Sequence, residues 1–280
     1  MGAMSPTRPV RTSAAFVWLS GIGTRSERIL AYVGGLAALV GRATAGLFFS
    51  RLKPRRSAQR SVHQAMAVGV RAVPIITLIT FFVGVIIALQ GAYGLQRLGA
   101  VQLVAGLVAI SITRELGPLV AAIVVIGRSG SAFAAEIGAM RVTEELDALQ
   151  TMAIDPIAFL VSPKLAAMMV MMPCLAIWSD LMGILGGALF GVSGAGFTFG
   201  SYLIATRESL AVRDITTGVA KSLFFGIVIT AVGCYEGFST GAGAEEVGRS
   251  TTSAVVISIL LVILIDLVFT FLFYSARPAI

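Results

Sequence analysis

The sequence predicts an all-α membrane protein with about five transmembrane helices and one further N-terminal helix that is interfacial or membrane-embedded. Of its 280 residues, 57% are hydrophobic and 12% are charged, whereas soluble domains average about 45–50% and about 25%. Residues 72–96 and 181–206 contain no Lys, Arg, Asp or Glu. Each of these stretches exceeds the about 20 apolar residues that are needed to cross a bilayer. A soluble fold is therefore not expected.

The N-terminal part of the chain is predicted to contain two segments. Residues 1–27 form a basic leader that is disordered or poorly defined, because residues 1–12 are rich in Pro, Ser, Thr and Arg. Residues 13–23 also resemble the apolar core of a signal peptide, and this alternative stays open. Residues 28–60 alternate apolar patches with basic side chains, which favours an interfacial helix followed by a basic linker.

Residues 61–280 are predicted to form the membrane domain. Its five spanning helices are expected where apolar residues run long enough to cross, at about 72–95, 101–126, 165–192, 217–236 and 253–274.

The charge distribution predicts the orientation of these spans. Residues 1–71 contain eleven Lys and Arg residues but only one acid, Glu27. Basic residues beside a first span favour the cytoplasmic side, so the N-terminus is expected inside and, after five crossings, the C-terminus outside. The 127–164 connection then lies inside. With a membrane domain following it, the basic segment favours contact with a lipid surface and not with nucleic acid.

Charged residues inside the expected spans are candidates for function, because each costs about 2.5–3.5 kcal/mol to insert. Arg114 and Glu115 are about 100° apart on a helix, so each is expected to pair with another group or face a polar lumen. Pro118 can kink this helix. The pair could line a transport pathway or form a structural charge pair. Asp180 and Asp266 could be helix–helix hydrogen-bonding groups. Alternatively, Glu115, Asp180 and Asp266 could couple protons in a secondary transporter.

The segment from Glu136 to Asp155 is the most informative connection. We expect Thr143 to cap a short helix whose first turn is acidic, which is favourable at a helix N-terminus. Leu146 and Leu149 supply part of an apolar stripe, and the segment ends before a proline. Such a helix could dock on a soluble partner, or it could be a connector that lies on the membrane.

Small residues and missing motifs complete the prediction from the residues alone. Five glycines at helix-packing spacing are expected at contacts between spans: Gly183, Gly187, Gly191, Gly233 and Gly237. The chain has no GxxxxGK[ST] phosphate loop and no constellation typical of a catalytic or metal site. We therefore expect no enzyme activity, no cofactor and no metal ion in this chain.

Several motifs in order resemble one family of membrane proteins. These are RELGP at residues 114–118, GRSGS at 127–131, EIGAMR at 136–141, EELDA at 144–148, AIDP at 153–156 and GCYEGF at 233–238. Together they resemble the MlaE/YrbE permease family over roughly residues 60–275.

The resemblance implies the permease subunit of an ATP-binding-cassette (ABC) transporter in the bacterial inner membrane. It implies a homodimer, two cytoplasmic ATPase subunits that bind ATP and Mg²⁺, and an MCE-domain lipid-binding protein on the periplasmic side. Whether a STAS-domain subunit joins is left open. The implied activity moves phospholipids or related lipids between the inner membrane and the MCE carrier, which maintains outer-membrane lipid asymmetry.

Carried over by position, the resemblance implies two groups of site residues. Those at or near the lipid cavity are Tyr93, Arg114, Glu115 and Asp266. Those that couple the chain to the ATPase are Glu136, Arg141, Glu144, Glu145, Leu146, Asp147, Leu149 and Asp155. The rival interpretations are the proton-coupled transporter and a structural membrane anchor.

Overall fold

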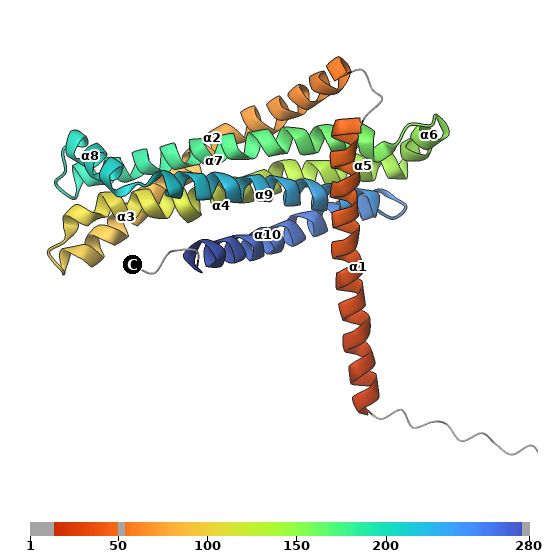
Figure 1. The fold of residues 1–280 in the computed structure, drawn as a ribbon, viewed down its shortest axis with the longest axis horizontal. Helices are drawn as coiled ribbons and strands as arrows, with labels where there is room; N and C mark the ends of the chain where they lie inside the picture. The colour runs from red at the N-terminus through yellow and green to blue at the C-terminus, as the bar shows by residue number, and fades with distance from the viewer. Residues whose placement is uncertain (1–13, 50–53, 276–280) are drawn as a thin grey trace, which may run out of the picture. The chain divides into compact units, whose positions relative to one another are not determined.

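The computed structural model describes residues 14–49 and 54–275, and every regular element in them is a helix (Figure 1). The chain divides into two compact units, Met1–Ala38 and Leu39–Ile280. In chain order the helices are α1 (Ala14–Phe49), α2 (Pro54–Gln96), η1 (Val101–Leu103), α3 (Val104–Ser111), η2 (Ile112–Leu116), α4 (Gly117–Val125), η3 (Ile126–Gly130), α5 (Ser131–Val142), α6 (Glu145–Thr151), η4 (Ile157–Val161), α7 (Ser162–Ser193), α8 (Phe199–Ser209), α9 (Val212–Phe238) and α10 (Ala244–Ser275).

Six helical stretches of the described residues are long and apolar enough to cross a membrane. They are Leu30–Leu47, Gln59–Gln96, Val101–Val142, Ile157–Ser193, Val212–Phe238 and Ala244–Phe273. The last five overlap the five expected spans. The predicted fold class, an all-α membrane protein, is confirmed.

The N-terminal segments differ from the expected division. Helix α1 begins at Ala14, so residues 14–27 of the expected leader are helical, whereas residues 1–13 lie outside the described residues. The expected helix over 28–60 corresponds to the end of α1 and the start of α2, which begins at Pro54. Residues 50–53 between them are also outside the described part. Whether this region lies along a membrane stays a prediction.

The helix that contains the second expected span is longer than that span. Helical structure continues from Val101 through Val142, past residue 126 where the expected span ends. The expected connection begins at residue 127, but the chain continues through GRSGS in the π-helical turn η3. Gly233 of α9 packs against the backbone of Gly130 in this turn. A Cβ added to Gly233 would lie 2.8 Å from the Gly130 carbonyl oxygen. This close approach favours a continuous helix, because the small residues let two backbones pack together.

The connection between the third and fourth spans contains the additional helix α8. Thr198 caps it, because its Oγ1 accepts a hydrogen bond from the Ser201 N–H at 3.3 Å. The Ser201 Oγ in turn accepts one from the Thr198 N–H at 3.0 Å, which completes a capping box. Tyr202 on α8 is fully buried. Helix α8 is therefore anchored to the bundle.

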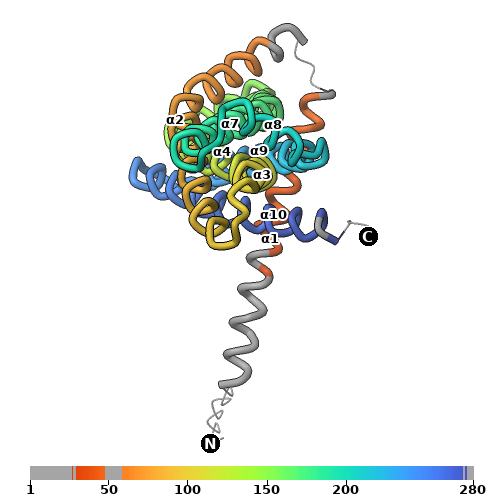
Figure 2. The backbone as a smooth tube through the Cα atoms, turned by 90° about the vertical axis from the view of Figure 1, so that its left-hand side faces the viewer, coloured from red at the N-terminus to blue at the C-terminus, as the bar shows by residue number. Residues whose placement is uncertain are grey.

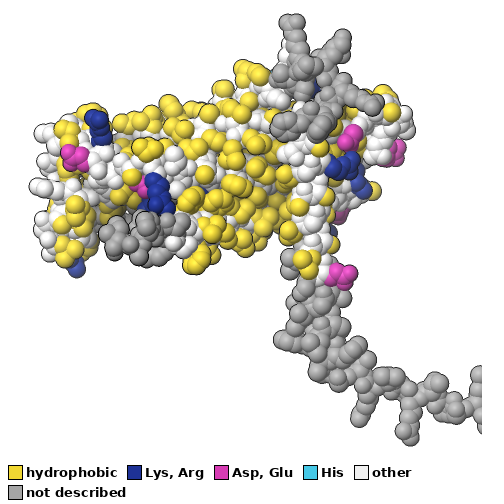
Figure 3. Space-filling view, viewed as in Figure 1, with side chains coloured by type: hydrophobic (Ala, Val, Ile, Leu, Met, Phe, Trp, Pro, Cys, Tyr) yellow, Lys and Arg dark blue, Asp and Glu magenta, His cyan; other side chains and the backbone are white. Residues whose placement is uncertain are grey.

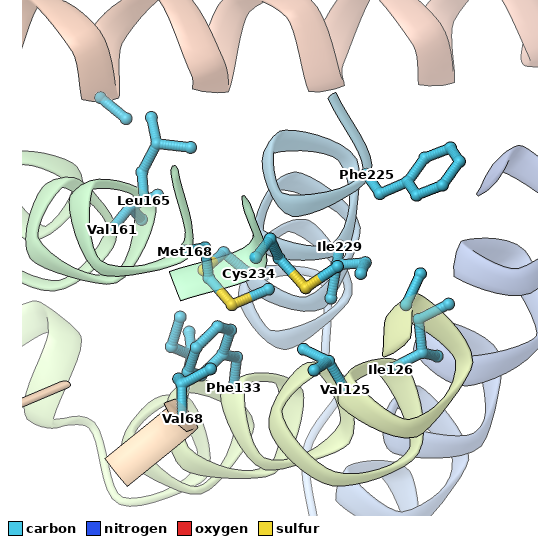
Figure 4. Packing of buried hydrophobic residues seen from close by; sticks show 14 of the residues in the cluster. Val68, Val125, Ile126, Phe133, Val161, Leu165, Met168, Phe225, Ile229 and Cys234 are labelled. Carbon is cyan, nitrogen blue, oxygen red and sulfur yellow. The ribbon is translucent and has the colours of Figure 1, made fainter. Parts of the chain in front are cut away.

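The described residues of the second unit, 39–49 and 54–275, form a bundle in which α7 and α9 are central. Helix α7 packs against α2, α4 and α9, whereas α9 also packs against α5 and α10. Figure 2 views α4, α7 and α9 nearly end-on, with α10 running across the view. Figure 4 shows Met168, Ile229 and Cys234 at the centre of the main cluster, with Phe133 and Val68 beside them. On the face seen in Figure 3, hydrophobic side chains cover the middle of the bundle and charged side chains lie mostly toward its ends.

Candidate functional site

The first part of the site is an interruption in the second span. Pro118 has no N–H, so the carbonyl of Arg114, four residues earlier, has no α-helical donor. The chain forms the π-helical turn η2 at this point, and such turns occur frequently at functional sites. The Lys221 ammonium donates a hydrogen bond to the Arg114 carbonyl at 3.2 Å. A lysine of α9 thus replaces the missing backbone donor.

Lys221 is also the centre of a charge cluster. Its side chain is 2% exposed, and Nζ lies 2.6 Å from Glu115 Oε2 and 2.9 Å from Asp266 Oδ1. The contact with Asp266 is an ion pair whose geometry does not meet that of a hydrogen bond. Nζ also donates to Thr270 Oγ1 at 2.8 Å. The buried ammonium of Lys221 on α9 therefore joins Glu115 of the second span to Asp266 and Thr270 of α10.

Arg114 has a different partner from Glu115. Its Nε lies 3.1 Å from Asp214 Oδ1 at the start of α9, and both side chains are largely buried. The other oxygen of Asp214 accepts the Ala211 N–H at 3.0 Å and so caps α9. The expectation that Arg114 and Glu115 each pair with another group is confirmed.

A cavity of about 230 Å³ opens beside this cluster. Helices from the second, fourth and fifth spans contribute its walls. It is lined by Ile110, Ser111, Arg114, Glu115, Thr217, Lys221, Thr270 and Phe273. Asp266 is not one of these lining residues, but it forms an ion pair with Lys221, which is. Three of the four residues expected at a lipid cavity therefore lie together.

Tyr93 is placed apart from the other three. It lies near the end of α2, is 65% exposed and does not line the cavity. Its hydroxyl accepts a hydrogen bond from Arg97 Nη2 at 2.7 Å.

The segment predicted to couple to an ATPase divides into internal and exposed charges. Glu136 Oε2 pairs at 2.7 Å with Lys164, which is 1% exposed. Arg141 donates to the Phe238 carbonyl at the end of α9. Asp155 Oδ1 pairs with Arg42 at 3.2 Å and accepts the Ile157 N–H. These three side chains hold the ends of the segment in place.

Helix α6 presents the remaining charges. Leu146 and Leu149 are buried, whereas Glu144, Glu145 and Asp147 are exposed. A groove of about 400 Å³ lies between α6 and the end of α9, with Arg141, Glu144 and Asp147 among its lining residues. The short helix is therefore amphipathic, with an acidic outer face.

One detail of this segment was predicted wrongly. Thr143 does not cap α6, because it ends α5 and its hydroxyl donates to the Ala139 carbonyl and to Glu145 Oε1. Helix α6 instead begins after Glu144, which has a left-handed backbone with φ of 60° and makes no side-chain cap. The turn between α5 and α6 uses this left-handed conformation at Glu144. Gly or Asn usually occupies such a position, so the TEEL sequence does not reveal it.

Comparison with known proteins identifies the family. The family model described as Permease MlaE matches residues 61–272. The chain belongs to the MlaE permease family. A probable ABC transporter permease protein of Rickettsia bellii is 39% identical over 259 residues, which cover 91% of this chain and 96% of the relative.

Two further relatives extend the comparison. The intermembrane phospholipid transport system permease protein MlaE of Haemophilus influenzae is 36% identical over 216 residues, or 77% of this chain and 83% of the relative. A probable ABC transporter permease protein of Synechocystis is 36% identical over 232 residues, or 83% and 88% of the two chains. This MlaE-family chain is thus an ABC transporter permease with several membrane helices.

The glycines predicted at helix contacts face neighbouring helices in this MlaE-family bundle. A Cβ added to any of the five would lie less than 3.0 Å from an atom of another helix. Two of them contact Tyr202 of α8. The five are Gly183, Gly187, Gly191, Gly233 and Gly237.

Sequence reasoning missed two charged members of the cluster, Lys221 and Asp214. Lys221 is absent from the residues predicted from the sequence. However, it is the one charged residue within the expected 217–236 span apart from Glu236 near its end, and the insertion cost that singled out Arg114 applies equally to it. Asp214 lies just before that expected span, so no comparable signal identified it.

Proposed function

We propose that this chain is the permease subunit of an ATP-driven phospholipid transporter, working between the inner membrane and an MCE-type periplasmic carrier. The observation that carries the proposal is the 36% identity over 216 residues to the Haemophilus influenzae phospholipid transport permease. In this proposal two copies of the chain pair, and two ATPase subunits bind ATP and Mg²⁺ at the cytoplasmic side. The transport maintains outer-membrane lipid asymmetry.

The size of the cavity supports a paired arrangement. At about 230 Å³, the cavity is smaller than the about 300–1,000 Å³ typical of sites for drug-sized molecules. A phospholipid with two acyl chains needs a larger cavity than one copy of the chain supplies. A second copy of the chain would enlarge the cavity, with the Lys221 cluster facing the polar headgroup region.

The continuous second span supports coupling between ATP hydrolysis and this cavity. One helical stretch carries Glu115 near one end and reaches Val142, just before α6, at the other. At about 1.5 Å per residue, the distance along it from Glu115 to α6 is about 40 Å. A movement of α6 against an ATPase would therefore be transmitted to the cavity through one helix, with η2 and η3 as its points of altered geometry.

Reconstituted lipid transfer tests the proposal. We expect transfer of labelled phospholipid from proteoliposomes to a carrier to need the ATPase subunit and hydrolysable ATP. The proton-coupled alternative predicts transfer driven by a pH gradient without ATP, and that result would contradict the proposal.

The Asp180→Asn variant sharpens this distinction. Asp180 is buried, and its Oδ1 has no hydrogen-bond partner among the described residues. Asparagine keeps its shape without a titratable proton, so we expect ATP-driven transfer to persist. Complete loss of transfer with unchanged assembly would instead favour a proton relay through this residue.

A further inference from the structure

A second cavity, of about 460 Å³, lies at the end of the bundle where α2, α5 and α7 meet. Its walls combine polar side chains of α2 with apolar side chains that flank the start of α7. Its lining includes Gln59, Arg60, Gln64, Phe159, Lys164 and one acid, Glu136. It shares no lining residue with the Lys221 cavity.

Arg60 is the chemically distinctive group in this cavity. Its guanidinium carbon lies 4.0 Å from the centroid of the Phe159 ring, a cation–π contact. No carboxylate among the described residues pairs with Arg60 in the structure. The ring contact holds the guanidinium beside the cavity wall. The planar fork of N–H donors on a guanidinium matches a phosphate.

The other lining groups add donors without cancelling the charge of Arg60. Lys164 and Glu136 neutralise each other at 2.7 Å, and Lys164 also lies 5.0 Å from the Phe133 ring. Gln59 and Gln64 offer amide N–H donors. The cavity is therefore suited to an anion with several acceptor oxygens.

An apolar stripe leads away from the cavity along α2. Positions 59, 63, 66 and 70 lie on one face of a helix, and the side chains of Met66 and Val70 are 60% and 65% exposed. A polar opening followed by exposed apolar side chains on the same face fits a ligand with a charged head and hydrocarbon tails.

We infer that this cavity binds the phosphate of an anionic membrane phospholipid, whose acyl chains follow the Met66 and Val70 face into the bilayer. Arg60 is the principal phosphate ligand. The inference goes beyond the proposed function, because a lipid held here is bound at the bundle surface and need not be the one transported.

Photo-crosslinking tests this site. The full chain is placed in phosphatidylcholine nanodiscs that contain phosphatidylglycerol with a photoactivatable headgroup, and labelled peptides are identified by mass spectrometry. We expect labelling around residues 59–66 and 157–163. Arg60→Gln should reduce this labelling by about tenfold, because it removes a charge-assisted hydrogen bond. Arg60→Lys should restore part of it, since it keeps the charge without the fork.

Matched controls separate phospholipid binding in this cavity from diffuse charge attraction and from binding of free phosphate. Arg207 on α8 is also exposed and lies away from the cavity, so Arg207→Gln should leave the labelling unchanged. Equal loss in Arg207→Gln and Arg60→Gln would mean diffuse charge attraction and overturn the inference. Competition by inorganic phosphate as effective as that by unlabelled phosphatidylglycerol would assign the site to free phosphate and also overturn it. ATP-driven transfer is measured separately, so failure here leaves the proposed function standing.

Discussion

At the scale of single residues, Lys221 determines how the charges of three spans coexist. Glu115 and Asp266 are carried by different helices, and both carboxylates lie within 3 Å of the same ammonium group. Buried charges are tolerated when they are paired, but a partner left behind after one is removed is costly. The interhelical cluster is thus a stabilising contact as well as a candidate lipid contact.

Replacing Lys221 with methionine tests this arrangement. We expect Lys221→Met to lower the free energy of unfolding by about 1–3 kcal/mol, because it removes the buried ammonium that pairs with two partly buried carboxylates. The thermal unfolding midpoint of the purified chain in detergent would measure the effect. The double variant Lys221→Met/Asp266→Asn should recover part of the loss, since one orphaned carboxylate is neutralised. Additive losses in the double variant would show that the two side chains are not coupled.

At the scale of elements, contact between α2 and α7 depends on glycine. A Cβ at Gly84 would overlap the Gly183 carbonyl, and one at Gly186 would overlap the Phe81 carbonyl. Lipid chains are as apolar as core side chains, so close backbone packing contributes much of the association between membrane helices. The sequence indicated the α7 glycines but not which helix each would meet.

Gly84→Ala should therefore destabilise the bundle by about 1–3 kcal/mol through overpacking. Gly94 on the same helix is the matched control, because an added Cβ there meets nothing within 4 Å. Gly94→Ala should be neutral or slightly stabilising, since alanine favours helix over glycine. Thermal unfolding of the two variants in detergent provides the comparison. Equal effects would indicate that helix propensity, and not the α2–α7 contact, is responsible.

Helix α6 is the element expected to bind an ATPase in the proposed function. Glu144 and Glu145 are exposed, so charge reversal of both should disturb a partner more than the fold. We expect Glu144→Lys/Glu145→Lys to lower the amount of ATPase that co-purifies, while the chain still inserts in membranes. Glu208→Lys, an exposed acid on α8, should leave co-purification intact. An unchanged yield with the α6 variant would contradict a coupling role for these acids.

At the scale of the whole bundle, the second expected span determines whether the residues before and after it lie on the same side of the membrane. Leu98 precedes the helical stretch Val101–Val142 and Met152 follows it, and their side chains are 77% and 61% exposed. We expect a single crossing to separate them. The positive-inside expectation places Met152 in the cytoplasm.

Cysteine labelling in intact cells tests this topology. In a Cys174→Ala/Cys234→Ala background, a membrane-impermeant maleimide should label Leu98→Cys from outside and Met152→Cys only after the cells are opened. The reverse pattern would invert the orientation, and labelling of both from one side would contradict the crossing itself.

The sequence by itself determined the fold class, the approximate places of five long apolar helices and most of the charged and small residues that matter. Membrane insertion depends on local composition, so apolar runs and the charges that interrupt them are visible in the chain. Tertiary structure decided the pairing: Lys221 meets Glu115 across 106 positions, and Arg114 meets Asp214 and not its neighbour in sequence. It also decided that GRSGS continues a helix, because close packing on Gly233 outweighs the local tendency of these residues to break one.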